Sequence, residues 1–198
     1  MNVPAPVTLI PGDAKAVQDV RPYGGFQIVL ADPPWNFSGN SKAKPGKNAR
    51  QHYDCMPLDE IAALPVKDVV ALDALLLMWV TVPFAELAFR VLKGWGFKYK
   101  SQLVWPKSRI GTGYWARNKH ELLYIARRGR FPCPGNALFP TSIIPGRSRE
   151  HSRKPDWVHE VIDAQYPETQ RVEIFARQPR PGWVVLGNQV NRFEGVAA

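Results

Sequence analysis

The sequence is poor in cysteine and in acidic residues. Its 198 residues include two cysteines, and 17 acidic residues stand against 26 lysines and arginines. Two cysteines are too few for a disulfide scaffold. The four histidines show no metal-ligand spacing with them, so we expect no metal site. There is also no apolar run of about 18 residues and no signal-peptide pattern, so we expect a cytoplasmic protein without membrane contact.

The positive charge is concentrated in three stretches of the chain. Residues 38–53, 98–130 and 147–154 hold most of the lysines and arginines, with only two acids, Glu121 and Glu150. Such clustering is typical of proteins that bind a polyanion. A basic face that is merely solvated is the alternative. Because the clusters fall in glycine-bearing, loop-like sequence, they favour nucleic acid as the partner.

Short apolar runs alternate with helix signals along the chain. Strands are expected at residues 7–10, 26–31, 74–80, 98–105, 122–126, 172–176 and 183–186. Helices are expected at residues 58–64, from Pro83 to about Lys93, and after Lys154. This order predicts one α/β domain over residues 1–198, with a mostly parallel sheet and helices on both faces. Ligands bind beyond the carboxyl ends of such strands, where Asp13, Asp32, Thr81 and Arg177 fall.

The strand expected at residues 26–31 ends in Asp32-Pro33-Pro34-Trp35. Proline has no backbone donor and a fixed φ, so this elbow is stiff and keeps its carbonyl acceptors. Acceptors beside the ring of Trp35 suit the amine of a purine, because accepting its two N–H groups favours attack by the nitrogen. Stacking on Trp35 would hold the base with about 1–3 kcal/mol. The alternative is an ordinary Asp-Pro turn with Trp35 in the core.

The tetrapeptide DPPW after an apolar strand resembles the catalytic motif of the MT-A family of N6-adenine methyltransferases. Seven further segments occur in the family's order: LLLMWVT (75–81), GWGFKY (94–99), VWPK (104–107), GYWARNKHELL (113–123), RKPD (153–156), VEIFAR (172–177) and GWVVLGNQ (182–189). The resemblance covers residues 12–189. It implies a Rossmann-like methyltransferase fold in permuted motif order, with S-adenosyl-L-methionine as cofactor. The sequence has no GxGxxG fingerprint, so that test would miss the cofactor site.

The resemblance also implies roles for individual residues. The catalytic tetrad is Asp32, Pro33, Pro34 and Trp35. Cofactor contacts fall on Asp13, Ala14, Asp32, Lys154, Glu173, Arg177, Asn188 and Gln189. Of these, Lys154 is expected at the methionine carboxylate, and Arg177 with the two amides at the ribose hydroxyls. Glu173 and Arg177 are expected on one face of a strand. Substrate contacts fall on Tyr53, Lys107, Tyr114, Trp115 and Arg117.

Three functions are compatible with this sequence. The first is methylation of adenine N6 in DNA by a bacterial or phage enzyme, located in the bacterial cytosol or nucleoid, and the compact form favours it. The second is methylation of N6-adenosine in RNA, because the catalytic corner contacts only the base. The third is a non-catalytic nucleic-acid-binding partner subunit, although the family's degenerate subunits have lost the tetrapeptide that is intact here. A homodimer, or a partner subunit that shares target recognition, is left open.

Overall fold

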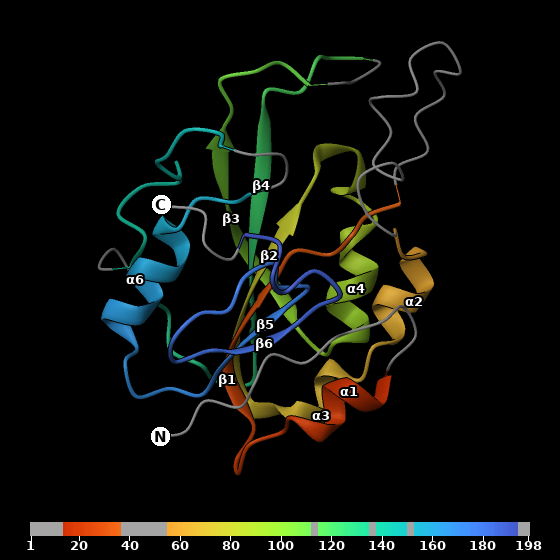
Figure 1. The fold of residues 1–198 in the computed structure, drawn as a ribbon, viewed down its shortest axis with the longest axis vertical. Helices are drawn as coiled ribbons and strands as arrows, with labels where there is room; N and C mark the ends of the chain where they lie inside the picture. Colours follow the sequence, from red (N-terminus) through yellow and green to blue (C-terminus); the bar gives the residue numbers. More distant parts are fainter. Residues whose placement is uncertain (1–13, 37–54, 112–114, 135–137, 150–152, 194–198) are drawn as a thin grey trace.

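The centre of the protein is a six-stranded sheet in the order β3-β4-β2-β1-β5-β6 (Figure 1). The computed structural model describes residues 14–36, 55–111, 115–134, 138–149 and 153–193. The strands are β1 (Phe26–Ala31), β2 (Val70–Val80), β3 (Lys98–Pro106), β4 (His120–Arg128), β5 (Arg171–Ile174) and β6 (Val184–Leu186). β1 pairs in parallel with β2 and β5, and β5 with β6, whereas β4 runs antiparallel to β2 and β3. The predicted mostly parallel sheet is confirmed.

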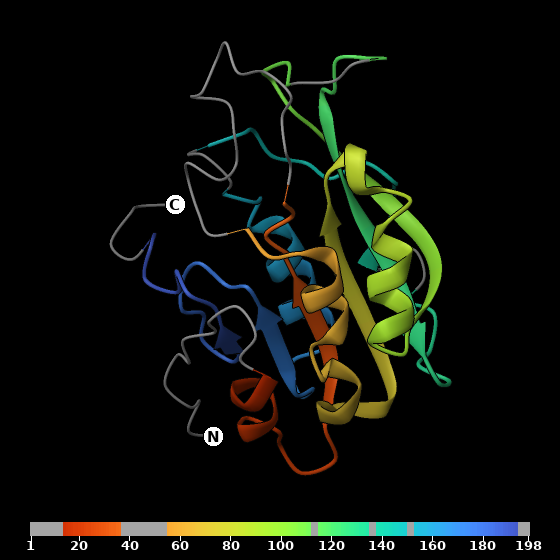
Figure 2. The ribbon, with the colours of Figure 1, turned by 90° about the vertical axis from the view of Figure 1, so that its right-hand side faces the viewer.

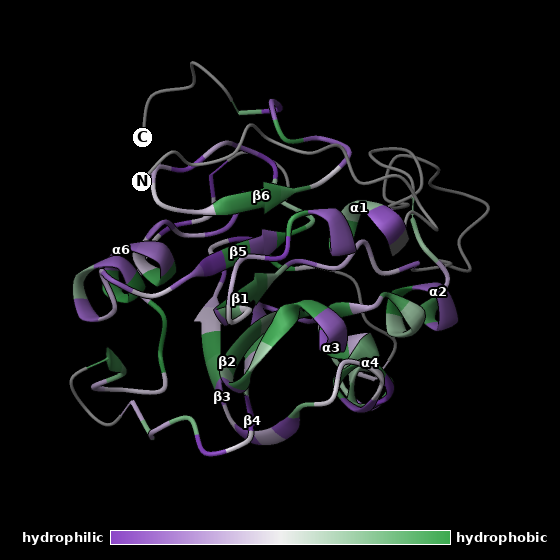
Figure 3. Ribbon diagram, turned by 90° about the horizontal axis from the view of Figure 1, so that it is seen from below, coloured by the Kyte–Doolittle hydropathy of each residue, from purple (hydrophilic) through white to green (hydrophobic). Residues whose placement is uncertain are grey.

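Helices cover both faces of this sheet. One face carries α1 (Ala14–Asp19), α2 (Leu58–Ala63), α3 (Val66–Val69), the 3₁₀ turn η3 (Val82–Phe84) and α4 (Ala88–Gly94). The other face carries α6 (Trp157–Gln165), which Figure 2 shows behind the strands and Figure 3 shows apart from the other helices. Within the described ranges, none of the helices is long and apolar enough to span a bilayer.

The alternation of side chains along β1 divides the core into two layers. Val29 and Ala31 pack with the helices α1 to α4, and Ile28 and Leu30 pack with α6. Successive strand residues point to opposite faces, and here both faces are buried. This explains why β1 reads as a continuous apolar run rather than an alternating one.

Some element boundaries differ from the sequence-based expectations. The single helix expected from Pro83 to Lys93 is a 3₁₀ turn followed by α4, and the hydroxyl of Tyr124 donates to the Ala85 carbonyl oxygen between them (2.8 Å). In a continuous helix the Ala85 carbonyl oxygen would accept a backbone hydrogen bond within the helix, but here it accepts the hydrogen bond from Tyr124. The helices α1 and α3 were not predicted, and the strand expected at residues 7–10 lies outside the described residues.

We predict that Gly94→Ala destabilises the fold, although alanine is the better helix former. A Cβ at this position would lie 2.3 Å from the carbonyl oxygen of Ala62, so α4 would have to move away from α2. Overpacking of this kind costs about 1–3 kcal/mol. Urea unfolding should show this loss, while Lys93→Ala on the exposed surface of the same helix stays within about 0.5 kcal/mol of wild type. Equal stability of Gly94→Ala and wild type would contradict the close approach.

Candidate active site

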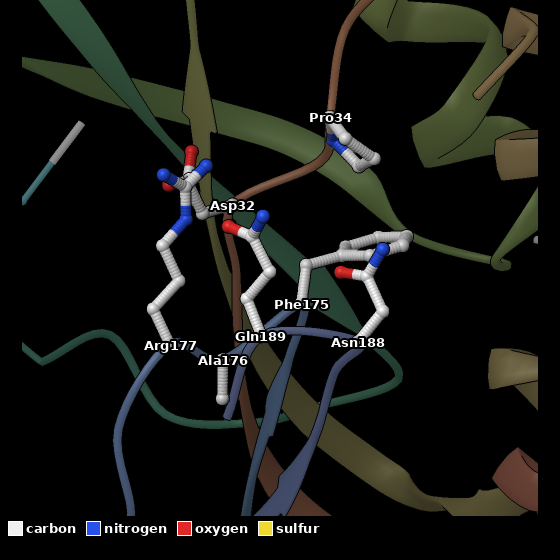
Figure 4. Close-up of a pocket in the computed structure, with 7 residues that line it drawn as sticks. All are labelled: Asp32, Pro34, Phe175, Ala176, Arg177, Asn188 and Gln189. Atoms are coloured by element: carbon white, nitrogen blue, oxygen red, sulfur yellow. Dashed lines mark ion pairs between the residues drawn. The ribbon is translucent and has the colours of Figure 1, made fainter. Parts of the chain in front are cut away.

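A pocket opens at the carboxyl ends of three adjacent parallel strands, β1, β5 and β6 (Figure 4). The residues that line it are Asp32, Pro34, Phe175, Ala176, Arg177, Asn188 and Gln189. The predicted convergence of Asp32 and Arg177 is therefore confirmed. Thr81 follows β2 but does not line the pocket, and Asp13 lies outside the described residues.

The pocket wall depends on a close approach of the chain after β5 to the chain after β6. The Ala176 amide donates to the carbonyl oxygen of Leu186 (2.9 Å). A Cβ on Gly187 would lie 2.3 Å from the Ala176 oxygen, so only glycine fits there. Phe175 has a φ of 67°, which is unusual for a residue with a side chain. This conformation turns the chain directly after β5. Strain of this kind costs about 1–3 kcal/mol and concentrates at functional sites.

Two partly buried positive charges lie beside the carboxylate of Asp32. The Lys154 ammonium lies 2.9 and 2.8 Å from its two oxygens, and a guanidinium nitrogen of Arg177 lies 3.8 Å away. Lys154 also lies 3.4 Å from Glu121, which follows the first residue of β4. Burial alone would lower the pKa of Lys154, but the charges of Asp32 and Glu121 outweigh it and raise the pKa above its usual value. Lys154 is therefore a cation at neutral pH.

The elbow after β1 is fixed by backbone hydrogen bonds. The Trp35 amide donates to the Pro33 oxygen (2.8 Å), which closes a γ-turn around Pro34, and the Met56 amide donates to the Pro34 oxygen (3.1 Å). Each proline carbonyl oxygen thus accepts one backbone hydrogen bond, and each keeps a second lone pair as an acceptor. Of the two prolines, Pro34 lines the pocket and Pro33 is buried.

The expectation that Trp35 offers a face for stacking on a base is wrong for this structure. The side chain is 4% exposed and belongs to the core beside α2 and α4. Its indole N–H donates to the Trp79 oxygen at 3.1 Å, and its ring stacks on Phe84 with a centroid distance of 5.3 Å. A buried indole needs such a partner for its N–H group. Trp35 therefore holds the elbow from the inside.

The expectation that Glu173 and Arg177 share one face of a strand is also wrong. Glu173 projects toward α6, where its carboxylate lies 2.8 Å from the Nε2 of His159, and it does not line the pocket. The two residues share no strand face, because β5 ends at Ile174 and Phe175 turns the chain. A contact of Glu173 with the cofactor has no support in this arrangement.

The residues expected to contact substrate fall into three groups. Tyr53 and Tyr114 lie outside the described residues. Trp115 and Arg117 are exposed beyond the ends of β3 and β4, and the Arg117 Nε donates to the Gly111 oxygen (2.9 Å). Lys107 instead forms an ion pair with Glu121 next to the site. Ala14, expected at the cofactor, is the first residue of α1.

A second ion-pair network braces the segment that carries Lys154. The Asp156 carboxylate accepts hydrogen bonds from Arg149 (2.6 Å) and Arg180 (2.8 Å). Arg149 also donates to the backbone oxygen of Lys154 (3.0 Å). Asp156 thereby ties the segment before α6 to the chain that follows Arg177.

Sequence reasoning missed Glu121, Phe175 and Gly187 as parts of the site. Glu121 carried one signal, as one of only two acids in the basic stretches. The Gly187-Asn188-Gln189 run carried another, since a glycine before two amides allows a close backbone approach. No feature of the sequence marked the positive φ of Phe175.

The chain has relatives among known methyltransferases. A family described as MT-A70 matches residues 26–189. The type II methyltransferase M.MunI of Mycoplasma sp is 28% identical over 187 residues, which cover 85% of this chain and 79% of that protein. An MT-A70-like N(6)-adenosine-methyltransferase of Arabidopsis thaliana is 31% identical over 196 residues, covering 91% of this chain and 27% of the relative.

The human N(6)-adenosine-methyltransferase catalytic subunit METTL3 is 30% identical over 183 residues, covering 87% of this chain and 30% of METTL3. The chain therefore spans less than a third of the length of these N(6)-adenosine-methyltransferases, but most of the length of M.MunI.

We predict that Trp35→Phe loosens the elbow without emptying the core. The phenyl ring keeps most of the packing on Phe84 but loses the hydrogen bond to the Trp79 oxygen, which is worth about 1–2 kcal/mol. Urea unfolding should show that loss, and hydrogen exchange at the Met56 amide should become faster. Trp115→Phe, on an exposed ring, serves as the matched control. Unchanged exchange at Met56 would show that Trp35 does not hold the elbow.

We predict that Asp156→Asn lowers stability at neutral pH by an amount that disappears in acid. Burial would raise the pKa of Asp156, but Arg149, Arg180 and Arg153 outweigh it and lower the pKa. A lowered folded-state pKa stabilises the protein above the unfolded value of 3.8, and the effect is lost as the pH falls through the folded value. Unfolding of both proteins from neutral pH to below pH 3.8 measures this. Asp68→Asn, at an exposed acid, is the control, and a pH-independent difference would contradict the prediction.

Proposed function

Because the chain belongs to the MT-A70 family, we propose that it transfers a methyl group from S-adenosylmethionine to the N6 amino group of adenine in DNA. MT-A70 methyltransferases use S-adenosylmethionine as methyl donor. The described helices and strands, from α1 to β6, form one sheet with its flanking helices, which supports action as a single methyltransferase domain. The observation that carries the proposal is the position of Asp32.

Asp32 lies on a stiff elbow at the mouth of the pocket, directly beside buried cations. The carboxylate can accept an N–H from an amine in the pocket, and the second lone pair of the Pro34 oxygen can accept the other. Acceptors held in place before the reaction stabilise the positive charge that develops on the attacking nitrogen. Trp35, anchored in the core, keeps these acceptors in position. The role that remains for the tetrad is therefore positioning and charge stabilisation.

The polar side chains of the pocket fit S-adenosylmethionine. Asn188 and Gln189 each offer donors and an acceptor for ribose hydroxyls, and Arg177 adds a donor fork beside them (Figure 4). Lys154 does not line the pocket, but it contacts Asp32 beside it and would supply the positive charge that a methionine carboxylate requires. When bound, the donor would supply a methyl carbon on a sulfonium, so that the N–C bond would form as the C–S bond broke; the sulfur would keep that electron pair, and the methylated nitrogen would release one proton to solvent. The residues of the chain need only align the two reactants, which can lower the barrier by several kcal/mol.

The proposed substrate is DNA because this chain is similar to M.MunI over 79% of the length of that protein. Its similarity to the N(6)-adenosine-methyltransferases covers less than a third of their length. Adenine in a duplex must be flipped out of the stack before its amine can reach the pocket. The basic segment between β3 and β4 carries the exposed Trp115 and Arg117, which suit stacking and phosphate contact. RNA is the second candidate, since the identity to the N(6)-adenosine-methyltransferases is slightly higher at 30–31%.

We predict that Asp32→Asn abolishes methyl transfer by removing the charged acceptor. The loss should be about 100-fold or more, as for other electrostatic groups aimed at developing charge. Transfer of tritiated methyl groups to DNA by the full chain measures it. Asp68→Asn, at an exposed acid, is the matched control.

The same assay separates the alternative functions. DNA and RNA of one sequence are offered side by side, in single- and double-stranded form. Label on DNA supports the proposal, and label on RNA alone replaces it with the RNA function. Binding of nucleic acid without any label would indicate a non-catalytic subunit. Wild-type transfer by Asp32→Asn would overturn the proposed role of the elbow.

A further inference from the structure

The ammonium of Lys154 is shared by two buried carboxylates. It lies 2.8 Å from Asp32 and 3.4 Å from Glu121. The Lys154 side chain is 15% exposed, and each of the two acids is 13% exposed. Because little water reaches these groups, the two carboxylates compete for the ammonium with weak screening. The position of Lys154 therefore depends on both acids.

Both oxygens of Asp32 face Lys154 in this arrangement. In the proposed reaction one of them must accept the substrate amine, so Lys154 has to loosen its contact. A buried ammonium without a partner is costly, by several kcal/mol. In the proposed function the methionine carboxylate supplies one partner for Lys154 when Asp32 turns to the amine, and a carboxylate of the chain itself can supply a second beside the ammonium. Glu121 already lies within reach of it.

Glu121 is itself held in place at the start of β4 by Lys107. It follows the first residue of β4, and the Lys107 ammonium contacts its other oxygen. The backbone of Lys107 donates to the Lys119 oxygen (2.8 Å), which joins the two strands at this point. Burial would raise the pKa of Glu121, but Lys154 and Lys107 outweigh it and lower the pKa, so the group is an anion at neutral pH.

We propose that Glu121 is a positioning residue that holds the Lys154 ammonium while the Asp32 carboxylate turns to the substrate amine. This inference rests on the proposed function. It assigns Glu121 two effects of opposite sign. Glu121 promotes turnover by freeing Asp32, and it weakens the binding of the donor, because its negative charge lies beside the cation that would bind the methionine carboxylate.

The test is Glu121→Gln, which keeps the shape and removes the charge. Calorimetry should show S-adenosylhomocysteine binding on the order of fivefold more tightly than to wild type. Binding of methylthioadenosine, which lacks the carboxylate, should not change. Under the same conditions kcat for methyl transfer should fall on the order of tenfold or more. Glu168→Gln, at an exposed acid, changes the net charge equally and should do neither.

A second variant protects the test against a folding defect. Lys107→Met removes one of the two cations that Glu121 contacts, so the negative charge of Glu121 acts on Lys154 alone. Lys154 is then less available to the carboxylate of S-adenosylhomocysteine, which should bind more weakly, while binding of methylthioadenosine is unaffected. The inference is overturned if Glu121→Gln weakens both ligands, if it leaves kcat unchanged, or if Lys107→Met fails to weaken S-adenosylhomocysteine. Absence of methyl transfer by wild type would refute the proposed function instead, and the two binding comparisons would still decide the charge effect.

Discussion

The ion pair between Asp32 and Lys154 joins parts of the chain 122 residues apart and determines the shape of the site. Asp32 follows β1, and Lys154 precedes α6. A buried ion pair adds little net stability, but removal of one partner leaves a costly lone charge. Its main effect is therefore geometric, since each group restricts where the other can lie. Arg149 and Asp156 hold the Lys154 segment, and Arg177 approaches Asp32 from the chain after β5.

The sheet topology explains why residues from five strands meet at one end of the sheet, where the parallel strands have their carboxyl ends. The parallel strands β1, β5 and β6 bring their carboxyl ends there, and with them Asp32, Arg177 and the two amides. β4 is antiparallel, so it begins at this end and contributes Glu121 near its first residue. β3 ends there with Lys107 next along the chain. A search for polar residues after strands finds the first set and misses Glu121, because Glu121 stands at a strand start.

The sequence allowed the main elements and part of the site to be predicted. Buried strands are visible because both faces of β1 and β2 require apolar residues. Arg177, Asn188 and Gln189 were expected together with Asp32 and do line one pocket. The direction of Trp35 could not be predicted, because an indole suits a core and a stacking surface equally well. The separation of Glu173 from Arg177 has a different cause. The alternation of β5 directs Glu173 toward α6, and the backbone conformation of Phe175, which no residue pattern indicates, redirects the chain before Arg177.

The buried Trp35 separates a stiff backbone from adjustable side chains. Two prolines, two backbone hydrogen bonds and a core indole leave the elbow little freedom to move. Any rearrangement that the reaction requires then falls to the side chains, and Lys154 has the flexible four-carbon stem that such a movement needs. The ring of Trp79, whose carbonyl oxygen holds Trp35, also lies 5.6 Å from the Lys154 ammonium. A cation over an aromatic face keeps a favourable contact while it shifts between two carboxylates. The same tryptophan thus fixes the elbow through its backbone and accommodates the mobile charge through its ring.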